Sequence, residues 1–440
     1  MPAELTPLDA GAVWTMVCAG LVLFMTPGLA FFYGGMTRAK ASVNMMMMSF
    51  VAMGLVAVVW VLWGFAMTGG DGVLGVVGNP FADPGLYGAV GTADMAGIGF
   101  SATFAIISVA LISGAVADRA RFSTWCLFVP VWTTLVYCPM AFMVWGGGLL
   151  TAEGAIGAAV GEAVDFAGGL VVHTAAGTAA LVLAIMMGKR HGFDADPRHR
   201  PHNIPFVMLG MTVLWVGWFG FNGGAATDIE TAGLIWVNTL VAPAAAMLGW
   251  IMVELARHGR PTSIGTASGV VSGLVAITPA CAFVDPVGAL VIGAVAGVAA
   301  ALAVNLKFKL GFDDSLDVVG VHLVAGIVGT LMIGLFGRPE LLAEEGRAGL
   351  FHGGGGALLL SQSVATVFTV VFTGVVTALI ALGLRAAMGL RVSTEDELRG
   401  VDQALHSESA YDYGLGTAYE TDPEDRLPEQ PSAGTASAVR

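Results

Sequence analysis

Apolar runs long enough to cross a membrane recur eleven times along this chain of 440 residues. A helix rises about 1.5 Å per residue, so about 20 apolar residues span a hydrocarbon core about 30 Å thick. Lipid offers no hydrogen-bond partners, so a spanning backbone must satisfy its polar groups within the helix. We predict an all-α polytopic membrane protein with eleven transmembrane helices. The expected spans are Ala10–Tyr33, Val43–Met67, Gly97–Ala117, Ser123–Trp145, Asp165–Gly188, Ile204–Gly223, Thr231–Glu254, Thr262–Ala282, Pro286–Phe308, Asp317–Gly337 and Gly356–Ala387.

The bulk composition agrees with this class. Hydrophobic residues make up 56% of the chain and charged residues only 12%, a balance that a soluble domain does not need. The net charge of −13 is concentrated in the tail, because eleven acidic and four basic residues lie from Arg391 onward. The chain has no basic patch or stripe, which excludes nucleic acid as an expected partner.

The basic residues predict the orientation of the spans. Every second loop is basic, whereas the other loops contain only Arg338 and Arg347. Loops rich in Lys and Arg face the cytoplasm, so the N-terminus is expected outside and, after eleven spans, the C-terminus inside. No basic region precedes the first apolar run, which we therefore expect to be a retained span and not a signal peptide. The cations assigned to the cytoplasmic side are Arg38, Lys40, Arg119, Arg121, Lys189, Arg190, Arg198, Arg200, Arg257, Arg260, Lys307 and Lys309.

Two segments share the pattern D-x7-H-x3-G. They are Asp165–Gly177, which begins the fifth expected span, and Asp314–Gly326, which begins near the tenth. Under the predicted orientation the two spans run in opposite directions. The tetrapeptides FYGG and FNGG, which close the first and sixth spans, repeat the same five-span spacing. We predict an inverted five-helix repeat followed by a final strap helix, an architecture in which the transport site lies between the repeats.

The histidines of these segments, His173 and His322, are the strongest functional candidates. Each lies eight residues, or about 12 Å of helix, beyond its aspartate, which places both near the membrane midplane. Ionisable side chains there indicate function by default. Burial favours neutral imidazoles, and two neutral rings can share one hydrogen bond while their other nitrogens face a pore. Such a lining suits a small neutral hydrogen-bonding solute or a relayed proton, and the plainer alternative is a pair that only joins two helices.

Three aspartates are candidate helix caps. Asp165 and Asp314 stand where spans begin, and a carboxylate there accepts backbone N–H groups and suits the helix dipole. Asp317 is an alternative cap to Asp314. Asp165 lies on the expected outer side, where it could also bias a cation toward the mouth.

Aromatic residues gather near the outer ends of several spans. An interfacial aromatic belt explains most such residues in membrane proteins. A cation–π site for a small cation is the sharper alternative. The residues concerned are Phe100, Phe104, Trp145, Trp215, Trp218, Phe219 and Phe221.

Other classes of function have weaker support. Two midplane histidines could ligate a haem for electron transfer, but helices rich in small residues leave little room for a macrocycle. The histidines of the loop after the fifth span, His191, His199 and His202, suit a solvated basic loop better than a metal site. No nucleophile triad, phosphate loop or metal cluster suggests an enzyme, so we expect no enzymatic activity, no cofactor and no bound metal.

Four stretches together resemble the ammonium transporter family (Amt/Mep/Rh), and specifically its Amt branch. The resemblance covers nearly the whole chain to about Tyr411. The matching stretches are Met25-Thr-Pro-Gly-Leu-Ala-Phe-Phe-Tyr-Gly-Gly35, Asp165-Phe-Ala-Gly-Gly-Leu-Val-Val-His173, Val275-Ala-Ile-Thr-Pro-Ala280 and Asp317-Val-Val-Gly-Val-His322.

The resemblance implies a homotrimer in the cytoplasmic membrane, with a narrow pore for ammonium or ammonia, and for methylammonium, in each subunit. By analogy Phe104 and Trp145 would form an outer aromatic recruitment site. Phe104 and Phe221 would form a stacked phenyl gate, with Trp218 beside it. His173 and His322 would be the twin-histidine pair. An ammonium sensor on the same fold is the alternative function.

Two departures from the family pattern concern the outer face. The recruitment site usually includes a serine hydroxyl, but the aligned residue here is Ala225, with Thr227 nearby. The loop Thr151–Val164 is several residues longer than usual and adds Glu153 and Glu162. We therefore expect a complete conduction path and an altered recruitment affinity.

Residues 388–440 are expected to form a cytoplasmic regulatory tail after a transmembrane domain of residues 1–387. The tail is acidic and polar, with little to bury, so we expect it to have little structure on its own. It resembles the family's docking segment for a trimeric PII-class nitrogen-signalling protein, and no useful family counterpart exists beyond Tyr411. The tail residues that carry this resemblance include Glu395, Gly400, Asp402 and Tyr411.

Overall fold

The computed structural model describes residues 9–195, 200–342 and 346–411. Within these ranges, ten helical segments are long and apolar enough to cross a membrane, which confirms an all-helical, multi-pass architecture. The segments are Ala10–Met36, Ala39–Gly64, Met95–Val116, Phe122–Trp145, Gly169–Met187, Ile204–Gly223, Ile229–His258, Pro286–Leu310, Val319–Phe336 and Ala357–Met388.

The eighth expected span is shorter than predicted. Instead of the run Thr262–Ala282, the helix α10 occupies Ser263–Ile277. Pro279 follows two residues later and has no backbone N–H with which to continue the helical hydrogen bonding. At about 1.5 Å per residue this helix is shorter than the hydrocarbon core, so length alone supports ten spans within the described residues.

The remaining elements subdivide or connect these spans. The α-helices are α1 (Ala10–Met36), α2 (Ser42–Val59), α3 (Met95–Ile112), α4 (Phe122–Trp132), α5 (Cys138–Trp145), α6 (Gly157–Val160), α7 (Ala175–Met187), α8 (Ile204–Gly223), α9 (Ile229–His258), α10 (Ser263–Ile277), α11 (Pro286–Ala303), α12 (Leu306–Leu310), α13 (Ala325–Phe336), α14 (Ala357–Met388), α15 (Thr394–Arg399) and α16 (Val401–His406). Short 3₁₀ turns are η1 (Ala39–Ala41), η3 (Ala66–Thr68), η4 (Pro84–Leu86), η5 (Ser113–Val116) and η9 (Leu350–His352). Four π-helical turns are η2 (Trp60–Gly64), η6 (Thr133–Tyr137), η7 (Gly169–Thr174) and η8 (Val319–Val324). One small antiparallel hairpin pairs β1 (Gly72–Val73) with β2 (Val77–Gly78).

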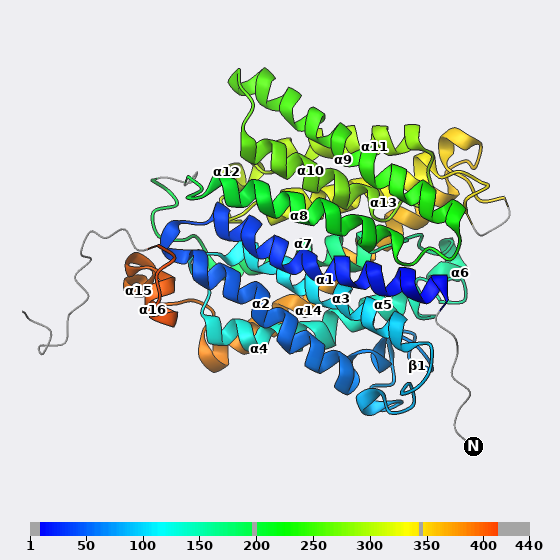
Figure 1. The fold of residues 1–440 in the computed structure, drawn as a ribbon, viewed down its shortest axis with the longest axis horizontal. Helices are drawn as coiled ribbons and strands as arrows, with labels where there is room; N and C mark the ends of the chain where they lie inside the picture. Colours follow the sequence, from blue (N-terminus) through cyan, green and yellow to red (C-terminus); the bar gives the residue numbers. More distant parts are fainter. Residues whose placement is uncertain (1–8, 196–199, 343–345, 412–440) are drawn as a thin grey trace, which may run out of the picture.

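The long helices lie side by side along the longest axis of the molecule (Figure 1). One end, at the left of the view, has α15, α16 and α12, and we call it the tail end. The opposite end has the β1–β2 hairpin and α6, and we call it the loop end. The helix α1 packs along α8 and α3, while α9 packs along α10 and α11.

Polar side chains before the helices explain why several spans begin where they do. Asp9, Asn203, Asp228, Thr262 and Asp285 each accept a hydrogen bond from a backbone N–H three residues later. This N-capping pattern satisfies one of the donors that the first turn of a helix leaves without an intrahelical partner. The start of the ninth expected span was predicted correctly because its cap is followed directly by a proline, which favours the first helical position.

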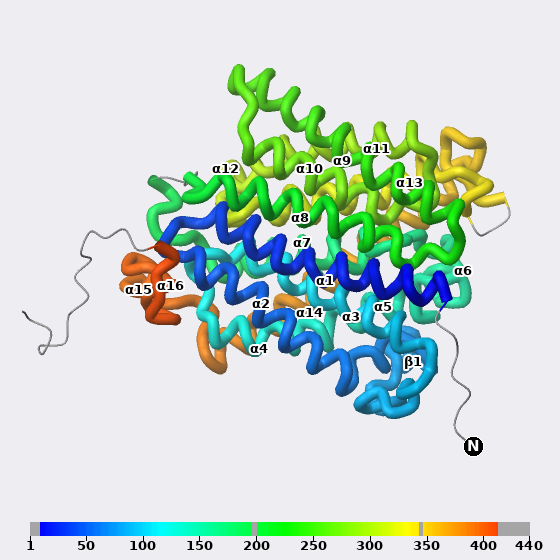
Figure 2. The backbone as a smooth tube through the Cα atoms, viewed as in Figure 1, coloured from blue at the N-terminus to red at the C-terminus, as the bar shows by residue number. Residues whose placement is uncertain are grey.

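The described part of the tail, residues 393–411, folds against the tail end of the bundle (Figure 2). The Asp402 carboxylate accepts hydrogen bonds from Val43 N (3.0 Å) and Asn44 N (2.7 Å), which caps α2. The buried Glu397 pairs with Arg391 at 2.6 Å. The partners of Asp402 lie on α2, whereas Arg391 is part of the tail itself; that the tail has little structure alone stays a prediction. Residues 412–440 lie outside the described residues.

Candidate functional site

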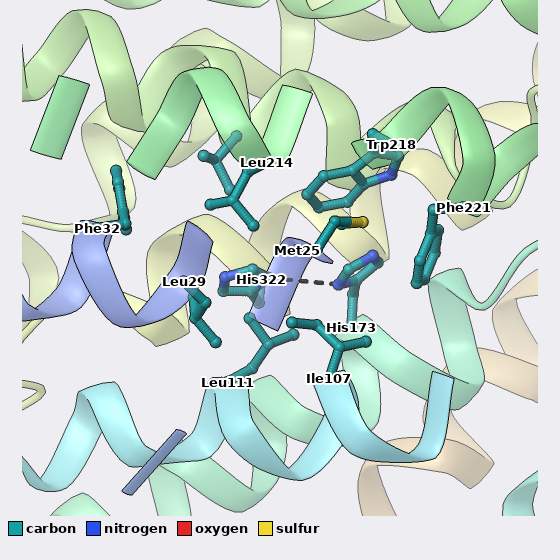
Figure 3. Close-up of a pocket in the computed structure, with 11 residues that line it drawn as sticks. Met25, Leu29, Phe32, Ile107, Leu111, His173, Leu214, Trp218, Phe221 and His322 are labelled. Atoms are coloured by element: carbon teal, nitrogen blue, oxygen red, sulfur yellow. Dashed lines mark hydrogen bonds between the residues drawn. The ribbon is translucent and has the colours of Figure 1, made fainter. Parts of the chain in front are cut away.

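The two predicted histidines meet in the middle of the bundle. The Nδ1 atoms of His173 and His322 are 3.3 Å apart, which is hydrogen-bond distance, and the ring centroids are 5.4 Å apart (Figure 3). Both side chains are buried. Because two neutral imidazoles share one bond by one donating and the other accepting, the remaining nitrogens stay available to a third group. The Nε2 atom of His173 is buried and has no hydrogen-bond partner within the described residues.

Aspartate carboxylates hold the start of each histidine segment. Asp165 accepts hydrogen bonds from four backbone N–H groups, those of residues 168 to 171, at 2.7 to 3.3 Å. Asp314 accepts from Val318 N (3.1 Å) and Val319 N (2.8 Å). Asp317, the alternative cap, pairs instead with Lys307 at 2.6 Å and adopts a positive φ of 64°. In each segment the pattern D-x7-H therefore places a capping carboxylate eight residues ahead of a buried imidazole.

Each histidine lies in a π-helical turn, η7 for His173 and η8 for His322. Turns of this type insert an extra residue and occur frequently at functional sites. Their presence at matching positions of the two segments agrees with the repeated sequence pattern. Nothing in the sequence analysis predicted them.

The glycines that end the two motifs allow the histidine helices to approach each other closely. A Cβ atom on Gly177 would lie 2.4 Å from the Leu323 backbone N. A Cβ atom on Gly326 would lie 2.9 Å from Thr174 Oγ1. Each glycine therefore faces the segment that contains the other histidine, which gives a physical reason for the last position of D-x7-H-x3-G.

A narrow apolar cavity runs past the histidines. Its volume is about 10 Å³, close to the minimum that holds one water molecule. Figure 3 shows the lining residues in a row from Phe221, past the imidazoles, to Phe32. The residues that line it are Met25, Leu29, Phe32, Ile107, Leu111, His173, Leu214, Trp218, Phe221, Val271 and His322. The aliphatic members could not be predicted from the sequence, because their residue types are those of any packed membrane helix.

Stacked aromatic rings lie beside the cavity, next to His173. The rings of Phe104 and Phe221 are nearly parallel, with centroids 4.1 Å apart, and both side chains are buried. Trp218 stacks on His173 at 5.3 Å, and its indole Nε1 donates to Thr278 Oγ1 at 2.8 Å.

Trp145 lies beyond the phenyl stack, at the loop end. Its ring is perpendicular to that of Phe104, with centroids 6.5 Å apart, and the residue is 41% exposed. Its indole Nε1 donates to the Asp165 carbonyl at 2.7 Å. Ala225 follows α8 and is exposed, and the Thr227 hydroxyl donates to Asp228 at 3.4 Å.

The geometry of the histidine pair does not fit a bis-histidine haem. An iron ligated by both rings would lie between them, but their Nδ1 atoms are already in direct contact at 3.3 Å. The loop histidines have other partners: the His202 ring contacts Thr37 O (2.9 Å) and the Tyr411 hydroxyl (3.1 Å). His199 lies outside the described residues. Across the ranges that the structure covers, no group of three His, Cys, Asp or Glu side chains could hold a metal ion.

A model of the Ammonium Transporter Family matches residues 13–411. The chain belongs to the ammonium transporter family. An ammonium transporter of Mycobacterium tuberculosis (strain ATCC 25618 / H37Rv) is 49% identical over 439 residues, covering 93% of this chain and 92% of the relative. Ammonium transporter Amt1 of Archaeoglobus fulgidus is 38% identical over 409 residues, covering 92% and 99%.

Solved structures of family members have the same fold. Candida albicans Mep2 superposes with a TM-score of 0.79 at 30% identity, covering 88% of this chain and 87% of that one. A protein titled Sensor Amt Protein superposes with a TM-score of 0.81 at 27% identity, covering 90% and 98%. Membership in the ammonium transporter family makes the chain a multi-pass membrane protein of a transporter class and not of an enzyme class.

In this member of the family, three of the four tail residues singled out from the sequence, Gly400, Asp402 and Tyr411, lie against loops and α2 at the tail end. Gly400 has a φ of 118°, and a Cβ atom there would lie 2.8 Å from the Lys40 side chain. The Tyr411 hydroxyl accepts from Asn203 Nδ2 at 2.7 Å. Glu395 is exposed in the first turn of α15.

Proposed function

We propose that each subunit conducts ammonium-derived nitrogen across the cytoplasmic membrane through the cavity beside His173 and His322. Ammonium, or methylammonium, is recruited at Phe104 and Trp145, and loses its proton near the phenyl gate. Ammonia then passes the imidazole pair. The observation that carries the proposal is the hydrogen-bonded, buried histidine pair in a cavity of about 10 Å³.

The chemistry of the lining supports a small neutral solute. A dry apolar channel with two weak polar contacts offers little to a bare metal cation, because an ion would lose its hydration without compensating charge. Ammonia can both accept and donate a hydrogen bond at an imidazole nitrogen. The imidazoles also provide a path for a proton, since each ring can accept on one nitrogen and donate from the other.

The proposed topology has eleven transmembrane helices, with the short α10 as the eighth and α14 as the strap after an inverted five-helix repeat. Contacts between the basic loops support the orientation. Arg38 pairs with Asp118, and Arg190 pairs with Asp313, so loops far apart in sequence gather at the tail end. By the positive-inside rule this end faces the cytoplasm, and the loop end with Trp145 faces outward.

The assembly that we propose is a homotrimer whose cytoplasmic tails, residues 388–440, bind a PII-class nitrogen-signalling protein. The transmembrane domain of residues 1–387 then contains the whole conduction path. Family membership supports the trimer, and the docked tail supports a regulated partner site.

The decisive experiment replaces both histidines by leucine, His173→Leu with His322→Leu. Leucine keeps the cavity lined and removes the proton path, so we expect a folded trimer that has lost ammonium-evoked transport. The measurement is uptake plus current in proteoliposomes, with ammonium and potassium compared at matched protein density. Wild-type transport with unchanged selectivity in the double variant would show that the histidines are only structural.

An acidic replacement provides the matched control. In His173→Glu, a carboxylate can relay a proton and also pair with a cation. We therefore expect the variant to keep conduction and to admit potassium. A variant as selective as the wild type would contradict the role of neutral imidazoles in selectivity.

The likeness to the protein titled Sensor Amt Protein supports a second candidate, an ammonium sensor on the same fold. The same proteoliposomes separate the two functions. A sensor binds ammonium without sustained uptake, whereas a transporter accumulates it at a rate that scales with protein density.

A further inference from the structure

One side chain of the helix α14 holds the backbone directly before Asp165. Gln362 is fully buried; its Oε1 accepts from Val164 N at 2.8 Å and its Nε2 donates to Val164 O at 2.7 Å. The amide thereby pairs with both backbone groups of one residue, as a neighbouring strand does in an antiparallel ladder. The same Nε2 donates to Thr330 O of α13 at 3.2 Å. Gln362 therefore joins the segment before η7 to the helix that follows η8.

Val164, the residue that Gln362 holds, directly precedes Asp165 in the chain. Asp165, the next residue, caps η7 with its carboxylate and accepts the Trp145 indole N–H with its carbonyl. A displacement of Val164 would therefore move the cap of the His173 segment and the ring of Trp145 together. This chain of contacts connects α14, which contributes nothing to the cavity lining, to the aromatic mouth.

A second set of contacts joins the same loop to α14, two residues before Val164. The Arg347 guanidinium pairs with the Glu162 carboxylate at 3.4 Å, donates to the Glu162 carbonyl, and donates to the Ser361 hydroxyl at 3.0 Å. Ser361 directly precedes Gln362 in α14. We call Gln362, Ser361 and Arg347, together with Glu162 and Val164, the mouth clasp. It holds the end of the loop whose length departs from the family pattern.

We infer that Gln362 is a positioning residue for ammonium recruitment, acting through the mouth clasp on Trp145 and Asp165. The inference rests on the proposed function, because it assigns recruitment to the mouth. A buried amide in a membrane helix is retained only when its groups are paired, and here all of its described bonds go to the backbone of other segments. Packing alone would be served equally well by an apolar side chain of the same size.

The test compares Gln362→Met with Thr366→Val. Methionine keeps the volume of the side chain and removes its three hydrogen bonds. Thr366 is a matched control: it is buried one turn along the same helix, and its hydroxyl donates to the Gln362 backbone carbonyl at 2.7 Å. In Gln362→Met we expect the half-saturation concentration for ammonium uptake to rise roughly 10-fold, the effect of losing about one hydrogen bond of positioning, while the maximal rate stays within about 2-fold.

A second measurement does not depend on transport. Hydrogen–deuterium exchange of the peptide covering residues 161–168 should accelerate in Gln362→Met and stay unchanged in Thr366→Val, because the Val164 N–H loses its acceptor only in the first variant. Unchanged exchange, or an unchanged half-saturation concentration, overturns the inference. If Gln362→Met does not fold, Arg347→Gln tests the same segment from the outer side of the mouth clasp. The exchange rate of residues 161–168 should rise, and the half-saturation concentration for ammonium uptake should rise roughly 3-fold. Wild-type values of these two quantities overturn the inference. Wild-type protein that takes up no ammonium refutes the proposed function, while the exchange measurement still decides whether the clasp holds the mouth.

Discussion

We propose that the methyl group of Ala225 lies at the outer recruitment site, where the family pattern has a serine hydroxyl. Ala225 is exposed after α8, and the nearby Thr227 hydroxyl is directed to Asp228. A hydrogen bond to a charged group contributes about 1.5–3 kcal/mol, or roughly 10–100-fold in affinity. The mouth should therefore bind ammonium more weakly than one with a serine.

Ala225→Ser should lower the half-saturation concentration for ammonium uptake by roughly 10-fold or more, because the new hydroxyl can accept from the cation. The maximal rate should change little, since the cavity is untouched. The measurement is initial uptake rate against ammonium concentration in proteoliposomes. Thr227→Val is the control: if it weakens recruitment in the wild-type background while Ala225→Ser has no effect, the threonine already supplies the acceptor.

At this scale the ionisable and aromatic residues could be predicted and the aliphatic lining residues could not. His173 and His322 stand out because ionisable groups are costly inside a membrane. Gln362 is a polar amide in an otherwise apolar span, where burial is also costly, but an amide is a weaker indication of function than an ionisable group. Leu29 and Leu111 line the cavity, but a leucine in a membrane helix has no feature that separates lining from packing.

The elements that position the site are two short irregular ones, η7 and η8. Their π-helical hydrogen bonding depends on the packing between two segments that are 149 residues apart, which no local pattern encodes. The helix of the fifth span begins at Gly169 and not, as expected, at Asp165. The reason is that the Asp165 carboxylate lies ahead of the helix and caps it. The apolar character and order of ten of the eleven expected spans are encoded locally and are confirmed, whereas the eighth is a shorter helix than its apolar run predicts.

Gly177→Ala should destabilise the protein by about 1–3 kcal/mol, the usual effect of overpacking. The added Cβ atom would lie 2.4 Å from the Leu323 backbone, which cannot yield as a flexible side chain would. The measurement is the thermal unfolding midpoint in detergent. Gly383→Ala in α14 is the matched control, because a Cβ atom there meets nothing within 4 Å; an equal loss in both variants would contradict the close approach of the histidine helices.

Asp314, which precedes its membrane span, predicts a pH dependence of stability. Burial raises the pKa of this carboxyl from 3.8 to about 6, although Lys307 opposes the shift. The folded protein therefore binds this proton more tightly than the unfolded chain does. The stability that the neutral form contributes is fully present below about pH 4 and is lost as the pH rises through about 6. The unfolding midpoint of Asp314→Asn, relative to that of the wild type, should accordingly rise between pH 4 and pH 7; a constant difference would contradict the shift.

On the scale of the whole molecule, the tail closes the chain on itself. Asp402 caps α2 from 359 positions away in the sequence, and His406 contacts Asn44 Oδ1 at 3.0 Å. Contacts of this range could not be predicted from composition, which indicates only that the tail has few apolar residues to bury. The tail also packs apolar side chains of its own, Val392, Val401 and Leu405, against Ala41.

Removal of residues 393–440 should abolish binding of the cognate PII-class protein while the trimer survives. The reason is that the tail packs on loops and helix ends, away from the cavity lining. The measurements are a pull-down with the purified partner and size-exclusion chromatography with light scattering. Asp402→Asn is the milder comparison and should weaken binding without removing any chain. Full binding by the truncated protein would assign the partner site to the inner loops alone.

The chamber beside the imidazoles has room for about one water-sized molecule. Knock-on conduction, in which one bound solute displaces the next, requires two occupied sites in series, and this chamber provides only one. A labelled molecule inside it can be neither overtaken nor pushed by a second one in the same place. Uptake should therefore saturate, while the ratio of the tracer fluxes in the two directions equals the ratio of the concentrations on the two sides, because every subunit passes its cargo one molecule at a time.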